Sequence, residues 1–218
     1  RPRLLSRDAA ADYTRASAPV VDSVSFVPLD ILGGWNDLFF MALMFIISGF
    51  FVGPSLDRKG PGRFLADRAK RLGIPFVFSA AVLSPIAYYP SWRLSDSVGG
   101  GHFLSRFFTV HGWQTGPAWF IWVLLAFCLI AAMAWAAAPG AMERLSWRPR
   151  TGRGLVLALL VITLSTILPT CHFVREEWVH LGGPILLPAQ RAPLYLALFV
   201  FGIAIGKAGL EVSLSRQV

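Results

Sequence analysis

Uncharged apolar stretches recur along this chain of 218 residues, and each is long enough to form a membrane-spanning helix. The first, residues 38–56, has 19 residues without a charge, and a helix of that length rising ~1.5 Å per residue would cross the ~30 Å hydrocarbon layer of a bilayer. We therefore expect an all-α fold, a multi-pass transmembrane helical bundle in which residues 1–218 form a single membrane domain. The predicted spans are five, near residues 38–56, 72–89, 117–142, 155–171 and 192–210.

A short basic segment, residues 57–71, separates the first two apolar stretches, and we call it the basic elbow. Pro61 suits the first turn of a helix, and on that helix Phe64 and Leu65 would lie near one apolar face. The pattern therefore predicts a short amphipathic helix that lies on the membrane surface. The elbow holds six cationic residues: Arg58, Lys59, Arg63, Arg68, Lys70 and Arg71.

Composition and charge support the membrane interpretation. Apolar residues make up 55% of the chain and charged residues 15%, whereas roughly a quarter of residues are charged in soluble domains. With five spans, the side of the membrane that carries the elbow has twelve basic residues and the other side eight, so the positive-inside rule places the elbow in the cytoplasm. We expect a multi-pass protein of the bacterial inner membrane that contacts membrane lipid, and we attribute the net charge of +8 to topology instead of nucleic-acid binding.

The polar connection at residues 172–191 contains the one pattern that resembles a metal site. His172, Glu176 and His180 recur every four residues and would share one face of a helix. Two histidines and a carboxylate in a surface loop are more often solvated, so we expect no metal. The sequence also has no Gly-rich phosphate loop, no Gly-x-Ser-x-Gly motif and no clustered cysteines.

Three segments occur in an order that resembles a known family. They are FFMALMFIISGFFVGPSLDRKGPGRFLADRAKRLGIPF, then GPAWFIWVLLAF with its Gly-x-x-Trp-Phe element, then PLYLALFVFGIAIGK. Together they make residues 30–210 similar to the integral-membrane acyltransferase family 3, which contains polysaccharide O-acetylases and glucan succinyltransferases. The resemblance implies an acyltransferase that takes an acyl group from a cytoplasmic acyl-CoA-type donor. The acceptor would be a hydroxyl of a glycan or other cell-envelope molecule, with acyl-CoA as co-substrate and no further cofactor.

The same resemblance implies that part of the catalytic apparatus lies outside this sequence. Members of the family have about ten spans, and their usual catalytic histidine, with an arginine upstream of it, lies in a first span. Residues 1–35 match the loop that follows that span, so we expect the sequence to be a fragment that lacks the first and last spans and is inactive alone.

The resemblance also points to donor-binding residues, each with a plainer alternative. Arg68 and Arg71 match an Arg-x-x-Arg pattern that could bind a donor phosphate through forked hydrogen bonds, or they could only set topology and attract anionic headgroups. Ser48 and Gly49 match a Ser-Gly-Phe element near the donor path, although small residues in a span commonly serve helix packing.

On the acceptor side the resemblance is weaker. Residues 116–119 match a Gly-His-Leu-Trp-like entry to a span, but Pro117 and Ala118 stand where that His and Leu are often found. Trp119 is more readily explained as an anchor at the membrane interface. His111, at the same rim, could contact an acceptor or be an ordinary loop histidine.

Two other functions remain open from the sequence. A transporter or channel segment would place ionisable residues within its spans, and only Lys207 does so here. A purely structural membrane protein is the third possibility, because most of the candidate residues also have packing or topology explanations.

Overall fold

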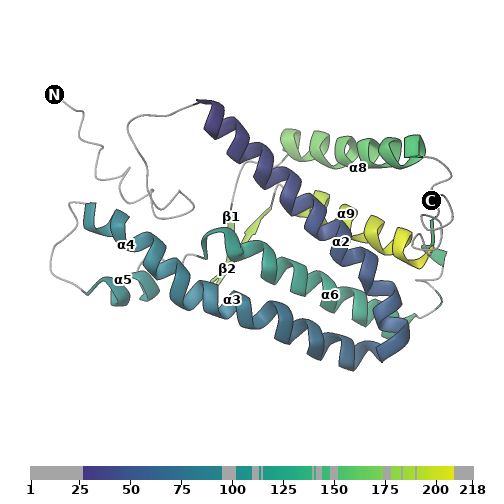
Figure 1. Ribbon diagram of the computed structural model, residues 1–218, viewed down its shortest axis with the longest axis horizontal. Helices are drawn as coiled ribbons and strands as arrows, with labels where there is room; N and C mark the ends of the chain where they lie inside the picture. Colours follow the sequence, from purple (N-terminus) through teal and green to yellow (C-terminus); the bar gives the residue numbers. More distant parts are fainter. Residues whose placement is uncertain are drawn as a thin grey trace, which may run out of the picture.

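The computed structural model describes most of the chain after residue 26. The described residues are 27–94, 102–109, 113, 115–138, 140, 144–147, 152–173, 178–182, 184–189 and 191–208. Figure 1 shows long helices side by side, with α2 (Val27–Arg68) leading into a turn and the chain then running back as a further long helix. The turn lies within α2, and the second helix of this hairpin is built from residues 61–68 of α2 followed by η1 (Ala69–Gly73), α3 (Ile74–Phe78), η2 (Ser79–Leu83) and α4 (Ser84–Leu94).

The remaining described elements pack around this helical hairpin. Helix α6 (Trp119–Ala137), preceded by the 3₁₀ turn η3 (Gly116–Ala118), contacts both α2 and η1, and α9 (Ala192–Lys207) packs along α2. Helix α8 (Gly152–Phe173) contacts α9, and the short α5 (Phe103–Thr109) contacts α4. Helices α6 and α9 therefore pack directly on α2.

The turn in α2 is made by Gly60. Its φ of 72° and ψ of 165° are not helical, and a positive φ of this size suits a glycine, which has no Cβ. Pro61 opens the next helix at its first turn, as the sequence predicts, because the missing N–H of proline is not needed there. The sequence expectation of a separate surface helix is wrong, however. Residues 61–94 form one continuous helical run, so the basic elbow supplies the last turn before Gly60 and the first turns of the helix that carries the second apolar stretch.

Two π-helical turns occur in that run, one ahead of Pro75 and one ahead of Pro85. Each contains the residue four positions before the proline, whose carbonyl the ring would strike in an ordinary α-helix. In η2 the N–H of Ser84 donates to the carbonyl of Ser79, which leaves the carbonyl of Ala80 facing a proline without an N–H. The indole Nε1 of Trp113 donates a hydrogen bond to this oxygen at 2.7 Å.

Helices α2 and α9 cross with glycine at the contact. A Cβ atom added at Gly49 would lie 2.1 Å from the carbonyl oxygen of Phe199, and one added at Gly206 would lie 2.0 Å from that of Phe50. Gly202 is equally close to the carbonyl oxygen of Ile46, at 2.2 Å. Since no side chain fits at these distances, the crossing is a small-xxx-small contact in which the two backbones touch.

Aromatic rings fill the space between α2, α6 and α9. The ring of Phe45 stacks on that of Tyr195 with centroids 4.7 Å apart and meets Phe127 at 5.5 Å. Phe45 and Tyr195 are fully buried. Offset and edge contacts of this kind add about 0.5–1.5 kcal/mol each beyond the burial of apolar area.

Each of the five predicted spans corresponds to a helical segment of the described structure, but not all are established as spans. Within the part of the chain that the structure describes, two helices are long and apolar enough to cross a bilayer, the one over Phe39–Pro90, which includes the turn at Gly60, and Trp119–Ala137. Gly152–Leu164 and Ala192–Lys207 are apolar but shorter. Apolar side chains of α8 are exposed, which suits a lipid environment: Val156, Leu157, Leu160, Val161 and Leu164.

The all-α prediction misses one small feature in the connection at residues 172–191. Strands β1 (Trp178–Gly182) and β2 (Ile185–Pro188) form an antiparallel hairpin, with Val179 opposite Leu187, and β2 contacts α6. The possible metal ligands do not share one helix face, because residue 172 lies at the end of α8 whereas residue 180 lies in β1. Glu176 lies outside the described residues.

Candidate functional site

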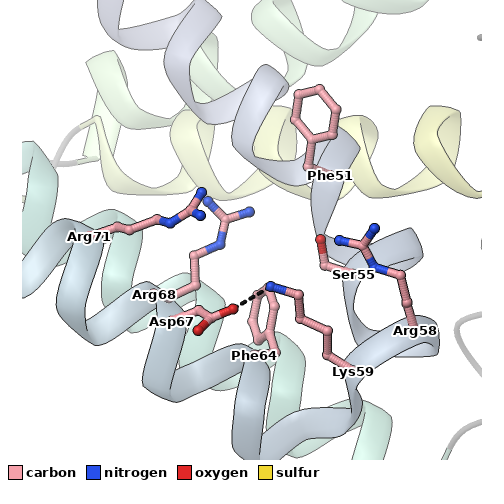
Figure 2. Close-up of a pocket in the computed structure, with 8 residues that line it drawn as sticks. All are labelled: Phe51, Ser55, Arg58, Lys59, Phe64, Asp67, Arg68 and Arg71. Carbon is pink, nitrogen blue, oxygen red and sulfur yellow. Dashed lines mark hydrogen bonds and ion pairs between the residues drawn. The ribbon is translucent and has the colours of Figure 1, made fainter.

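A pocket opens where the chain folds back at Gly60. Its volume is about 350 Å³, within the range of roughly 300–1,000 Å³ that small-molecule sites occupy. Both arms of the turn contribute to it, and Figure 2 shows Arg58 and Lys59 from one arm and Arg68 and Arg71 from the other extending into the space between them. The residues that line this pocket, which we call the elbow pocket, are Phe51, Ser55, Arg58, Lys59, Phe64, Asp67, Arg68 and Arg71.

Helical spacing explains why these residues meet. Before the turn, Phe51, Ser55 and Arg58 are separated by four and then three positions, so they share one face of α2. After the turn, Phe64 and Arg71 are seven positions apart and Asp67 and Arg68 lie between them, again on one face. Because Gly60 reverses the chain, the two faces are opposed across the pocket.

Arg68 and Arg71 extend from the arm after Gly60 toward the arm before it, as Figure 2 shows. The guanidinium carbon of Arg68 lies 5.3 Å from the centre of the Phe64 ring, within the distance for a cation–π contact. Phe64 is buried, with 2% of its surface exposed, so it gives Arg68 a fixed support. The sequence therefore selected two residues that the fold brings to one site.

A single carboxylate lies among these cations. The ammonium group of Lys59 donates a hydrogen bond to Asp67 Oδ2, and the two form an ion pair that joins the arms before and after Gly60. This bond and the charge of Lys59 hold the pKa of Asp67 below its ordinary value, and the charges of Arg71 and Lys70 lower it further. Asp67 is therefore ionised at neutral pH.

The chemistry of the elbow pocket is that of an anion site. Three guanidinium groups offer planar pairs of N–H donors that match phosphate oxygens, and the ammonium group of Lys59 adds a point charge. Ser55 adds a hydroxyl group. Among the residues that the structure describes, no group of three or more His, Cys, Asp or Glu side chains could hold a metal ion.

Ser48 and Gly49 lie higher on α2, in the crossing with α9. Gly49 is explained by packing, because its missing side chain lets the carbonyl of Phe199 approach. Ser48 is buried, with 7% of its surface exposed, and does not line the elbow pocket, although Ser55 lies two helical turns further along the same face. A role for Ser48 toward the donor stays a prediction.

The acceptor-side residues receive less support. Trp119 is the first residue of α6, is 5% exposed, and has its ring centroid 5.9 Å from that of Tyr195. The interpretation of Trp119 as an interface anchor is wrong, because its ring is buried in the aromatic core. His111 lies outside the described residues, and a contact of either residue with an acceptor stays a prediction.

Sequence reasoning missed several residues of the elbow pocket. The sequence favours a topological role for Arg58 and Lys59 over donor contact, and it does not mark Ser55 or Asp67 as site residues. The signal that could have found them is Gly60-Pro61 in the middle of a basic run, since this pair permits a reversal and starts a new helix. When a run of charged residues folds back on itself, its side chains meet in one pocket. In a straight helix the same residues would be spread along the surface.

Comparison with known proteins identifies the family. No curated protein and no solved structure matches the chain. The family model Acyl_transf_3, described as an acyltransferase domain, matches residues 19–218 and thus includes the elbow pocket and every described helix. The resemblance noted from the three sequence segments is therefore confirmed, and the chain belongs to the integral-membrane acyltransferase family 3.

Proposed function

We propose that this membrane acyltransferase domain takes its acyl group from a cytoplasmic acyl-CoA-type donor, whose phosphates bind in the elbow pocket. The observation that carries the proposal is the convergence of Arg58, Lys59, Arg68 and Arg71 on one pocket of about 350 Å³. Acyl-CoA is a polyanion through its phosphates, so its affinity would come from charge-assisted hydrogen bonds of this kind. The acceptor in this proposal is a hydroxyl group of a glycan or another cell-envelope molecule.

The reaction requires the pocket to position the donor and not to react with it. The acceptor oxygen would attack the thioester carbonyl, the new C–O bond would form as the C–S bond breaks, and the CoA thiol would leave. A general base takes the hydroxyl proton, and the family resemblance implies that this base is a histidine. With its phosphates fixed, the donor would hold the thioester at a constant position relative to the base. This positioning of the reactants would raise the rate of the reaction.

The proposed location is the inner membrane, with the elbow pocket on the cytoplasmic side where acyl-CoA is available. The excess of basic residues on the elbow side supports this orientation. The transporter alternative loses its main support, because Lys207 is not an isolated charge within a span. Its ammonium group lies 2.5 Å from Asp57 Oδ2 at the elbow, and Asp57 also accepts a hydrogen bond from Trp135.

Replacement of Arg68 and Arg71 by Ala in the full-length protein tests the proposal. Loss of even one hydrogen bond to a charged partner costs about 1.5–3 kcal/mol, so the affinity for CoA should fall at least tenfold, while insertion and thermal stability should be unchanged. Binding to the purified protein, measured by calorimetry, gives the affinity.

The matched control replaces Arg144 and Arg153 by Ala. These two arginines are exposed, lie on the same predicted side of the membrane and are outside the elbow pocket. The control variant removes the same charge and should bind CoA as the wild type does. An unaltered CoA affinity in the Arg68→Ala/Arg71→Ala variant would rule out the donor role.

A further inference from the structure

Asp57 immediately precedes Arg58 of the elbow pocket, yet it is not one of the residues that line the pocket. Its two carboxylate oxygens are instead occupied by different helices. Oδ1 accepts a hydrogen bond from the indole Nε1 of Trp135 at 3.2 Å, and Oδ2 accepts one from the ammonium group of Lys207 at 2.5 Å. Asp57 therefore ties the end of the arm before Gly60 to both α6 and α9.

The surface of α2 guides Lys207 to this carboxylate. Gly53 lies four positions before Asp57, which places the two residues on one face of the helix. A Cβ atom added at Gly53 would lie 2.9 Å from Lys207 Cγ and 3.1 Å from Lys207 Cε, so the lysine stem runs directly across the glycine. The exposed fraction of the Lys207 side chain is 11%, against 48% for Asp57. The ion pair is thus anchored on its buried side by α9.

The turn that carries Asp57 lies between two interruptions of the helix. Pro54 cannot donate a backbone N–H to the preceding turn, and the helical conformation is broken at Gly60, so residues 55–59 form one short turn between them. Buried Leu56 anchors this turn in the core, and Asp57 adds its polar contacts to other helices. Three residues that line the elbow pocket lie in the same turn: Ser55, Arg58 and Lys59.

Arg58 depends on this turn more than the neighbouring cations do. Lys59 has an ion pair with Asp67, and the guanidinium group of Arg68 lies over the ring of Phe64. Within the described structure, Arg58 has neither kind of contact, and its side chain extends from its own arm into the pocket (Figure 2). The position of the backbone at residue 58 therefore decides where this guanidinium group lies.

We propose that Asp57 is a positioning residue, which is bonded to Trp135 and Lys207 and thereby fixes the turn that presents Arg58 to the phosphates of the donor. The inference rests on the proposed function, since it takes the CoA phosphates as the ligand of the elbow pocket. It predicts the opposite sign to simple electrostatics. Removal of an acid beside an anion site would strengthen anion binding through charge alone, whereas the loss of a positioning residue weakens it.

The test is the CoA affinity of the full-length protein in detergent, measured by calorimetry. Asp57→Ala removes both bonds together with the negative charge, and it should weaken CoA binding about tenfold, the loss expected for one misplaced guanidinium group. Trp135→Phe removes one bond and leaves every charge in place, and it should weaken binding about threefold. Because the effect acts through Arg58, Asp57→Ala should change the affinity by less than about twofold in an Arg58→Ala background.

Trp113→Phe is the matched control for Trp135→Phe. The indole of Trp113 also donates one hydrogen bond, to the carbonyl oxygen of Ala80, but this contact lies outside the elbow pocket. The two substitutions are chemically identical, so a general loss of stability would affect both, and the melting temperatures measure that loss. Trp113→Phe should bind CoA as the wild type does.

The outcomes separate this inference from the proposed function. Unchanged or tighter CoA binding in Asp57→Ala, or an equal loss in Trp135→Phe and Trp113→Phe, overturns the positioning role of Asp57. An Asp57→Ala effect that persists undiminished in the Arg58→Ala background overturns it as well. If those results occur while Arg68→Ala/Arg71→Ala still weakens CoA binding, the proposed function stands without the inference. Failure of the wild type to bind CoA overturns both.

Discussion

Two neighbouring parts of α2 have different tasks: one crosses α9, and the other lines the elbow pocket. They differ in the size of the side chains that they present. At the crossing, Gly49 and Gly206 have no side chain, so the two backbones can touch. At the elbow, long cationic side chains such as Arg58 reach across an open space. The first region is filled by the protein itself, whereas the second leaves room for another molecule. The comparison teaches that one helix can hold a fixed contact and a ligand site within a few turns.

A substitution at the crossing should destabilise the protein more than one at the elbow pocket. Gly206→Ala places a Cβ atom 2.0 Å from the backbone oxygen of Phe50, which can move away only if the helices separate. Overpacking of this kind typically costs 1–3 kcal/mol, and we expect about 3 kcal/mol because the neighbour is backbone. Thermal unfolding of the purified protein in detergent measures the loss.

Gly73→Ala is the control for that substitution. Gly73 has a helical φ of −67° and no atom within 4 Å of the added Cβ, so the change should be neutral or should stabilise the protein by about 0.4–1 kcal/mol. Equal destabilisation by both substitutions would show that the crossing does not depend on close backbone contact.

A smaller effect is expected where the two regions meet, at Lys207. Its stem packs against Gly53 and its ammonium group pairs with Asp57. Lys207→Met keeps the packing of the stem and loses the ion pair, which should cost about 1 kcal/mol or less because Asp57 is half exposed. Lys207→Ala loses both and should cost more. A double-mutant cycle with Asp57→Asn isolates the ion pair, and a zero coupling energy would contradict it.

The smallest effect concerns pH at the elbow pocket. The pKa of Asp67 is held below its ordinary value of 3.8 by Lys59, so the stability that the pair contributes is present above 3.8 and is lost as the pH falls through the lowered pKa. The difference in melting temperature between the wild type and Asp67→Asn should thus be constant from neutral pH down to 3.8 and disappear below it. A difference that already fades near neutral pH would contradict the ion pair.

The sequence predicts the helices well because each follows from a local run of apolar residues. The crossing could not be predicted, because it packs Gly49 against a helix that begins at Ala192. A local sequence pattern does not show which other helix a given helix contacts. Trp119 shows the same limit, because an aromatic residue at the start of an apolar run fits the membrane interface or the core equally well. The hairpin formed by β1 and β2 was missed because its strands are only five and four residues long.

The candidate site was predicted in part. Arg68 and Arg71 came from the family resemblance and do lie together in the elbow pocket. Arg58 and Lys59 are not predicted there, because the sequence alone does not show that the two halves of the charge run face each other. Its meaning changes once Gly60 takes a positive φ and returns the second half of the run toward the first.

The accessibility of Ser55 decides whether the elbow pocket is a donor site open to the cytoplasm. Ser55→Cys is placed in full-length protein in which Cys128, Cys171 and any further native cysteine are replaced by Ala, and it is exposed to a membrane-impermeant maleimide in vesicles of either orientation. The account predicts labelling from the cytoplasmic side only, with CoA protecting Ser55→Cys and leaving Arg144→Cys, on the same side but outside the pocket, fully labelled. Labelling of Ser55→Cys from the outer side, or at an undiminished rate with CoA present, would contradict the account.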